Sequence, residues 1–164
     1  MNNNRCFQYC SNCKLSSNCC TNFKKINAPV CNYKEIKKIK EKTNLDKFYN
    51  IIDKDLYTLK IKEGKCIFFV NHKCNIYNIR PTDCRLFPYD IVNLNNKYYL
   101  ILYKLNCINI ENFLNIPNSI ESLIKDILPW ISKFTDKRNY DKMNKIDYVI
   151  LKEIKRKVKL SFFD

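Results

Sequence analysis

Glycine, histidine and long apolar runs are scarce in this sequence of 164 residues. Its one glycine, Gly64, cannot build a glycine-rich nucleotide-binding loop. Its one histidine, His72, makes a Ser-His-Asp or Cys-His catalytic arrangement an unconvincing interpretation. No apolar run approaches the roughly 20 residues that a membrane-spanning helix needs, and the first residues lack the apolar segment of a secretory signal peptide. We therefore expect a cytoplasmic protein with no membrane partner.

Cysteine, in contrast, is abundant. The chain has ten cysteines, and hydrophobic residues make up 46% of it. A core of this size can form without disulfides, so the cysteines need another explanation. In a reducing cytoplasm, clustered cysteines usually indicate metal or redox chemistry rather than structural disulfides.

The formal net charge of +14 is the third compositional feature. Two centres of four thiolates, each carrying about −2 with its metal, would lower this charge to about +10. The lysines accompany many Asn, Ile and Tyr residues, a composition that AT-biased genomes often produce. The charge therefore predicts solubility and non-specific attraction to polyanions. Nucleic acid stays open as a partner, with little in the sequence to support it.

Apolar spacing and turn residues predict an α+β fold. We expect a helix that begins at its cap, Asn32, and is interrupted at Thr43-Asn44. We also expect helices over 45–52, over 118–134 with a kink at Pro129, and over 141–160, together with a short helical turn over 81–85. We expect strands over 55–61, 66–70 and 97–105, and turns over 63–65 and 93–96. These elements would form a small single domain whose metal site lies in loops and strand ends. Residues 1–110 would bind the metal, and residues 111–164 would form a helical extension packed on them.

Eight cysteines are candidate metal ligands. They are Cys10, Cys13, Cys19, Cys20, Cys66, Cys74, Cys84 and Cys107. The Cys10-x2-Cys13 spacing lets two thiolates converge on one metal. The adjacent side chains of Cys19 and Cys20 diverge, so they suit two irons of one cluster, or two separate centres, better than one tetrahedral zinc. Spacing alone does not decide between two four-ligand sites and one cluster with spare cysteines.

The other residues near these cysteines are given simpler interpretations. We expect Cys31 and Cys6 to be buried thiols without a ligand role, since free cysteine is among the most buried residues. Arg80 and Arg85 either donate hydrogen bonds to sulfur and offset the charge of the centre, or fix local carbonyls and pair with Asp83 or Asp90.

The chain contains the pattern Cys10-x2-Cys13-x5-Cys19-Cys20, then Cys66-x7-Cys74-x2-Tyr77-x2-Arg80-Pro81-x2-Cys84-Arg85-x-Phe87-Pro88, then Cys107. Through this pattern, it resembles the YkgJ-type cysteine-cluster family over about residues 10–107. The resemblance implies a zinc- or iron-chelating domain. The chain departs from the family in having five residues without glycine between Cys13 and Cys19.

Three hypotheses on function follow. The resemblance and the adjacent cysteine pair favour an iron–sulfur cluster, most simply [4Fe–4S], with a redox, scaffold or metal-handling role. Larger proteins that resemble the family include flagellin lysine-N-methylases, so an S-adenosylmethionine-dependent protein-lysine methyltransferase-like protein is the enzyme alternative, on analogy alone. A zinc-stapled interaction module, with Zn2+ as the metal, is the third. Whether the protein is an enzyme is left open.

Overall fold

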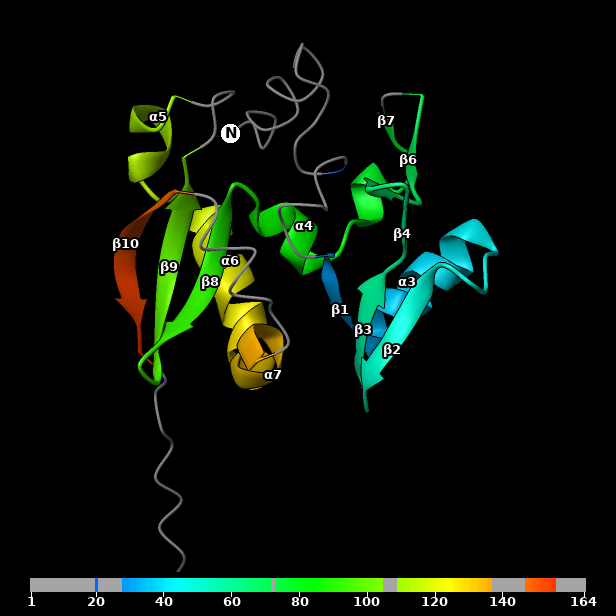
Figure 1. Ribbon diagram of the computed structural model, residues 1–164, viewed down its shortest axis with the longest axis horizontal. Helices are drawn as coiled ribbons and strands as arrows, with labels where there is room; N and C mark the ends of the chain where they lie inside the picture. The colour runs from blue at the N-terminus through cyan, green and yellow to red at the C-terminus, as the bar shows by residue number, and fades with distance from the viewer. Residues whose placement is uncertain (1–19, 21–27, 72, 105–108, 137–146, 156–164) are drawn as a thin grey trace, which may run out of the picture.

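The computed structural model describes residues 20, 28–71, 73–104, 109–136 and 147–155, and within them two three-stranded antiparallel sheets lie on either side of helix α4 (Thr82–Leu86) (Figure 1). The first sheet has the order β1-β3-β2 and consists of β1 (Val30–Asn32), β2 (Tyr49–Asp53) and β3 (Leu56–Leu59). The second has the order β10-β9-β8 and consists of β8 (Tyr89–Leu94), β9 (Lys97–Tyr103) and β10 (Tyr148–Ile154). The fold is α+β, as predicted.

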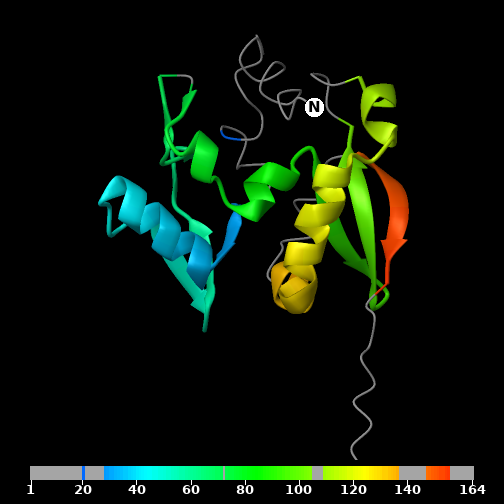
Figure 2. The same cartoon turned by 180° about the vertical axis from the view of Figure 1, so that it is seen from behind.

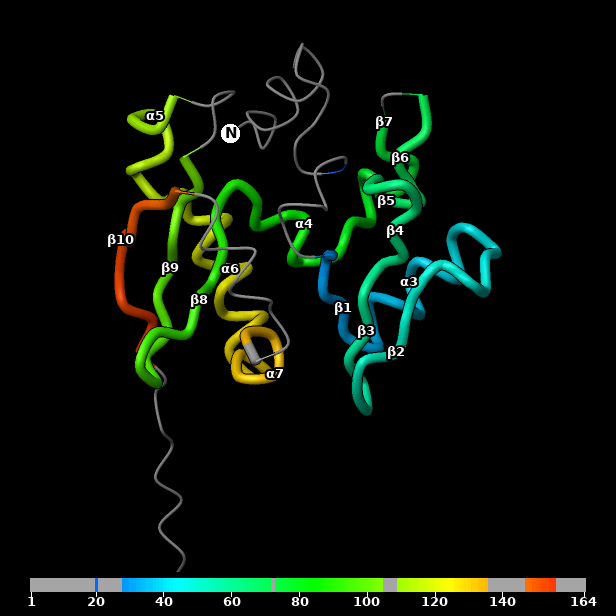
Figure 3. Tube along the Cα trace, viewed as in Figure 1, coloured from blue at the N-terminus to red at the C-terminus, as the bar shows by residue number. Residues whose placement is uncertain are grey.

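Two very short hairpins and one turn of 3-10 helix connect the first sheet to α4 (Figure 3). The hairpins pair β4 (Ile61–Lys62) with β5 (Lys65–Cys66), and β6 (Phe69–Val70) with β7 (Lys73–Cys74). The 3-10 turn is η1 (Tyr77–Ile79). The predicted turn at 63–65 and the predicted helical turn after Pro81 are both present, whereas the predicted strand over 66–70 is divided between β5 and β6.

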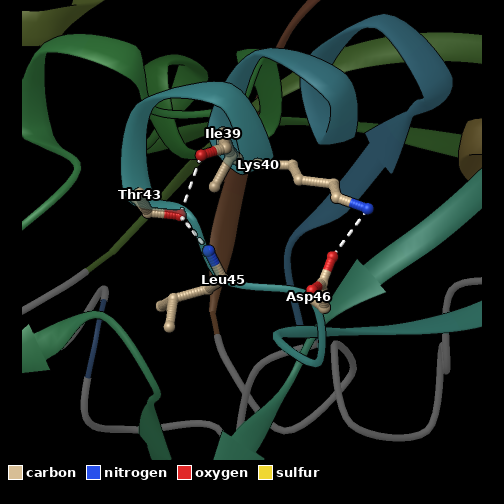
Figure 4. A network of polar contacts seen from close by, with 5 residues as sticks. All are labelled: Ile39, Lys40, Thr43, Leu45 and Asp46. Carbon is tan, nitrogen blue, oxygen red and sulfur yellow. Dashed lines mark hydrogen bonds and ion pairs between the residues drawn. The ribbon is translucent and has the colours of Figure 1, made fainter.

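Helix α3 (Tyr33–Thr43) begins where the sequence predicts, because its capping residues are local in the chain. The Asn32 side chain accepts a hydrogen bond from the Glu35 backbone N–H, and the Glu35 carboxylate accepts one from the Asn32 N–H. At the other end, Thr43 Oγ1 donates to the Ile39 carbonyl at 2.8 Å, and Lys40 Nζ lies 2.6 Å from Asp46 Oδ1 (Figure 4). Ile36 and Ile39 are buried in an apolar cluster that also contains Phe48 and Leu59.

After residue 110, the helix predicted over 118–134 is present, and a short helix that the sequence did not predict precedes it. The segment contains α5 (Glu111–Leu114), α6 (Asn118–Ile127), the 3-10 turn η2 (Leu128–Trp130) and α7 (Ile131–Asp136). The change of direction falls at Pro129, which has no backbone N–H to continue an α-helix. Helix α6 covers one face of the second sheet (Figure 2) and buries the side chains of Ile120, Leu123, Ile124 and Ile127 against it.

One apolar core runs through both sheets. Val30 of β1 and Leu56 of β3 belong to the same buried cluster as Leu86 of α4 and Leu100 of β9. Helix α4 contacts β1 on one side and α6 and β8 on the other. The predicted boundary at residue 110 stays a prediction.

Two predicted helices are wrong. Residues 49–53 form β2 and residues 148–154 form β10, whereas the sequence predicted helices over 45–52 and 141–160. Each strand contains a β-bulge, at Ile52 and at Leu151. A bulge inserts one extra residue, so side chains of like exposure become three positions apart instead of two. The bulges thus interrupt the two-residue alternation by which a strand is recognised in a sequence.

Strand β8 was not predicted, and it fills the gap between α4 and the predicted strand over 97–105, which is β9. Its residues Tyr89, Ile91 and Val92 are buried. Among the helices that the structure describes, none is both long and apolar enough to cross a membrane.

Candidate metal centre

Five cysteines lie in or against one apolar cluster beside the two hairpins. Its buried members are Cys31, Ile36, Ile39, Phe48, Leu59, Cys66, Phe68 and Ile76, and Cys20, Cys74 and Cys84 pack against them. Cys31, Cys66, Cys74 and Cys84 are free thiols. Four of the five cysteines, all except Cys31, are predicted ligands, so segments far apart in the sequence bring their sulfurs to one region.

The hairpins place Cys66 and Cys74 through tight turns. Between β4 and β5, Glu63 and Gly64 have φ values of 53° and 77°, the left-handed conformation that glycine adopts without steric cost. The turn sets Cys66 opposite Ile61, and the second hairpin sets Cys74 opposite Phe69. The Asn75 N–H donates to the Phe68 carbonyl at 2.9 Å, which joins the end of β7 to the start of its own hairpin.

Cys84 lies on α4 and Cys31 on β1, and two carboxylates hold these elements together. The Thr82 N–H donates to Glu35 Oε1 at 2.6 Å, and the Val30 N–H donates to Asp83 Oδ2 at 2.7 Å. The hydrogen bond between Val30 and Asp83 joins the neighbours of two cysteines, because Val30 precedes Cys31 and Asp83 precedes Cys84. The thiols of β1 and α4 therefore keep a fixed relation to each other.

Burial dominates the electrostatics of three thiols. It raises the pKa of Cys66, and it raises the pKa of Cys31 and of Cys84 well above the ordinary value of a cysteine. The Glu35 and Asp83 carboxylates raise the pKa of Cys31 further, and Asp83 raises that of Cys84. These thiols are therefore protonated at neutral pH, and a metal would have to displace their protons.

Cys74 has the opposite tendency. A hydrogen bond from the Cys20 side chain is the largest influence on it and lowers its pKa, against the effect of burial. The Ile76 backbone and the Arg80 guanidinium also lower the pKa of Cys74. Cys74 is thus more ready to become a thiolate than Cys31, Cys66 or Cys84.

Arg80 has a well-defined position. Its guanidinium lies 3.8 Å from the centre of the Tyr77 ring, and its Nε donates to the Tyr77 carbonyl at 3.1 Å. It thus fixes a local carbonyl, one of the two roles considered for it, while its charge also acts on Cys74. Arg85 is exposed. The Asp83 carboxylate accepts a hydrogen bond from the Val30 N–H. The Asp90 carboxylate accepts hydrogen bonds from the Tyr103 hydroxyl and the Ile91 N–H.

The remaining predicted ligands, Cys10, Cys13, Cys19 and Cys107, lie outside the described residues, as do Cys6 and His72. Within the described ranges, no three Cys, His, Asp or Glu side chains are close enough together to hold a metal ion by themselves. A complete site would therefore draw ligands from outside those ranges or tighten when the metal binds.

Cys31 was expected to be a buried thiol without a ligand role, and it lies closer to the candidate ligands than the sequence indicated. It is fully buried, as expected, but its thiol lies within the electrostatic influence of Cys66 and Cys84. No spacing rule indicated this, because Cys31 reaches the cluster through the pairing of β1 with β3.

The donor set fits a soft metal centre. Thiolates are the ligands that select zinc and iron–sulfur clusters, and five cysteine thiols, which become thiolates when they lose a proton to a metal, lie in or against one apolar cluster here. A family model named CxxCxxCC and described as "Putative zinc- or iron-chelating domain" matches residues 9–112. No curated protein and no solved structure gives a match to the chain.

Proposed function

Because the chain belongs to the CxxCxxCC family of zinc- or iron-chelating domains, we propose that it is an iron–sulfur protein whose cluster is held by cysteine thiolates. The observation that carries this proposal is the convergence of Cys20, Cys66, Cys74 and Cys84, from four separate segments, on one apolar cluster. Cys10, Cys13, Cys19 and Cys107 complete the proposed ligand set.

Iron is favoured over zinc by the number and the arrangement of the thiols. Ten cysteines exceed the four that one structural zinc requires. Cys19 and Cys20 are adjacent, and the Cys20 side chain is hydrogen-bonded to Cys74. Two neighbouring sulfurs that diverge suit two irons of a [4Fe–4S] cluster.

A bound cluster would supply one-electron redox chemistry. The chain's own residues would set the conditions for it. Cys66 and Cys84 would each give up a proton on binding, because burial keeps these thiols neutral without a metal. Arg80, fixed on the Tyr77 ring, would place a positive charge near the Cys74 thiolate and so favour the more reduced state of the centre.

A zinc centre is the second candidate, favoured by the fact that Cys20, Cys66, Cys74 and Cys84 are four thiols, the number that tetrahedral zinc takes. In that case the protein would be a zinc-stapled interaction module.

Anaerobic purification, followed by assays of iron, zinc and acid-labile sulfide per chain, tests the proposal. We expect iron and sulfide in similar amounts in the wild-type chain, and neither in the Cys84→Ala variant. The Cys31→Ala variant serves as the control and should retain both. Zinc without sulfide would support the second candidate, and a folded wild-type chain without metal would refute both.

A further inference from the structure

Two acidic side chains connect β1 and α3 to α4 in both directions. Glu35, in the first turn of α3, accepts hydrogen bonds from the Asn32 N–H at 2.9 Å and from the Thr82 N–H at 2.6 Å. Asp83, in the first turn of α4, accepts one from the Val30 N–H at 2.7 Å. Glu35 thus reaches from the first segment to the second, and Asp83 reaches back.

The N–H groups involved are ones that secondary structure leaves without an acceptor. The Thr82 N–H is at the first turn of α4, where no earlier carbonyl of the helix is available, and the Asn32 N–H is at the start of α3. Val30 is on β1, an edge strand of its sheet. One carboxylate oxygen for each N–H stabilises the junction and fixes the distance between the two segments.

Both segments carry a thiol of the cluster at the point of contact. Cys31 follows Val30 directly, and Cys84 follows Asp83 directly. Glu35 and Asp83 are part-buried in these hydrogen bonds, so water competes only weakly for the same donors. Moving α4 away from β1 would therefore move Cys84 away from Cys66 and Cys74, which come from the hairpins.

We infer that Glu35 and Asp83 are positioning residues of the metal centre, and that their hydrogen bonds from one segment to the other keep Cys84 in the same apolar cluster as the hairpin thiols, from which a metal can draw them together. The inference rests on the proposed function of these cysteines. Neither carboxylate is a ligand in it. Outer contacts of this kind typically change metal affinity by about 10- to 100-fold when they are removed.

Two substitutions of Asp83 separate the effect of its hydrogen bond from the effect of its negative charge. Asp83→Asn keeps an oxygen that can accept the Val30 N–H but removes the negative charge, whereas Asp83→Ala removes both. Glu35→Gln keeps one of two acceptor oxygens, so we expect it to lie between wild type and Glu35→Ala. Asp46→Asn is the matched control, because Asp46 is an exposed carboxylate that pairs with the exposed Lys40 (Figure 4).

The measurement is a Co2+ titration of each full-length, metal-free variant under anaerobic conditions, followed through the thiolate-to-cobalt absorption. We expect Asp83→Ala and Glu35→Ala to bind Co2+ at least about tenfold more weakly than wild type, with an altered absorption spectrum. Asp83→Asn should stay within about threefold of wild type, with an unchanged spectrum, and Asp46→Asn should match wild type. Circular dichroism of each metal-free variant shows whether it has folded.

Three results would overturn the inference. One is wild-type affinity in folded Asp83→Ala. Another is equal weakening in Asp83→Asn and Asp83→Ala, which would assign the effect to charge. The third is a lower unfolding midpoint with unchanged Co2+ affinity and spectrum, which would assign only a structural role. A wild-type chain that binds neither Co2+ nor iron would instead refute the proposed function, and the inference with it.

Discussion

Cys66 and Cys31 offer a matched pair of substitutions, because alanine removes the same sulfur atom from two equally buried places. Their side chains are 6% and 0% exposed and belong to the same apolar cluster. Only Cys66 is a proposed ligand. We predict that Cys66→Ala and Cys31→Ala destabilise the metal-free protein by similar amounts, and that only Cys66→Ala abolishes the extra stability that metal confers.

The magnitudes follow from two separate effects. Loss of one buried heavy atom costs about 1 kcal/mol, as in an Ile→Val substitution, which corresponds to about 2–4 °C in Tm for a chain of this size. A metal that binds only the folded state adds about 4 kcal/mol at a free concentration 1,000 times its Kd. Cys31→Ala should therefore cost about 1 kcal/mol with or without metal. Cys66→Ala should cost about 1 kcal/mol without metal and about 5 kcal/mol with it.

The assay is guanidinium unfolding under anaerobic conditions, of both variants and wild type, each with and without metal, together with metal content per chain. Equal losses for the two variants in the metal-loaded form would refute the reasoning. So would retention of metal by Cys66→Ala, or its loss from Cys31→Ala, which would make Cys31 the ligand.

Three further predictions follow from the described contacts. Iodoacetamide should modify Cys74 faster than Cys84 in the metal-free protein at pH 8, because the pKa of Cys74 is lowered and that of Cys84 is raised. Peptide mass spectrometry after a short exposure measures the order of modification, and faster modification of Cys84 would contradict the prediction. The free energy of unfolding of the metal-free protein should fall as pH rises past 9.0, because Cys31 and Cys84 keep their protons in the folded chain after the unfolded chain has lost them. Each thiol contributes up to about 1.4 kcal/mol per pH unit. If the free energy of unfolding of Cys31→Ala fell as steeply with pH as that of wild type, the result would count against this account. Tyr103→Phe should lower the free energy of unfolding by about 1–3 kcal/mol, because the buried Tyr103 hydroxyl donates a hydrogen bond to Asp90 at 2.6 Å. A thermal unfolding midpoint equal to that of wild type would show that this hydrogen bond contributes nothing to stability.

The parts of the fold that the sequence predicted are those determined by neighbouring residues. Helix α3 has its capping residues, Asn32 and Glu35, three positions apart. Helix α6 has an apolar face of regular spacing, and Pro129 marks its end. Strands β2 and β10 could not be recognised, because each contains a bulge that interrupts the two-residue alternation of a regular strand, and only pairing with β3 and β9 makes them strands.

The candidate site likewise has features that the sequence indicated and features that depend on contacts between distant residues. Cysteine spacing identified Cys66, Cys74 and Cys84, and the structure brings their segments to one cluster with Cys20, although their role as ligands stays a prediction. The position of Cys31 beside them was not predictable. The roles of Glu35 and Asp83 were not predictable either, because each depends on a hydrogen bond between residues about 50 positions apart in the chain.

Strand β10 has a consequence for any attempt to study the family region by itself. The family match ends at residue 112, yet β10 pairs with β9 from Tyr98 to Tyr103, and α6 covers the second sheet. A shortened chain that stopped at residue 112 would leave this part of β9 with one row of backbone groups open to pairing with another molecule. Truncation at the limit of sequence similarity would thus give a protein prone to self-association, and the cysteine cluster is better studied in the full chain.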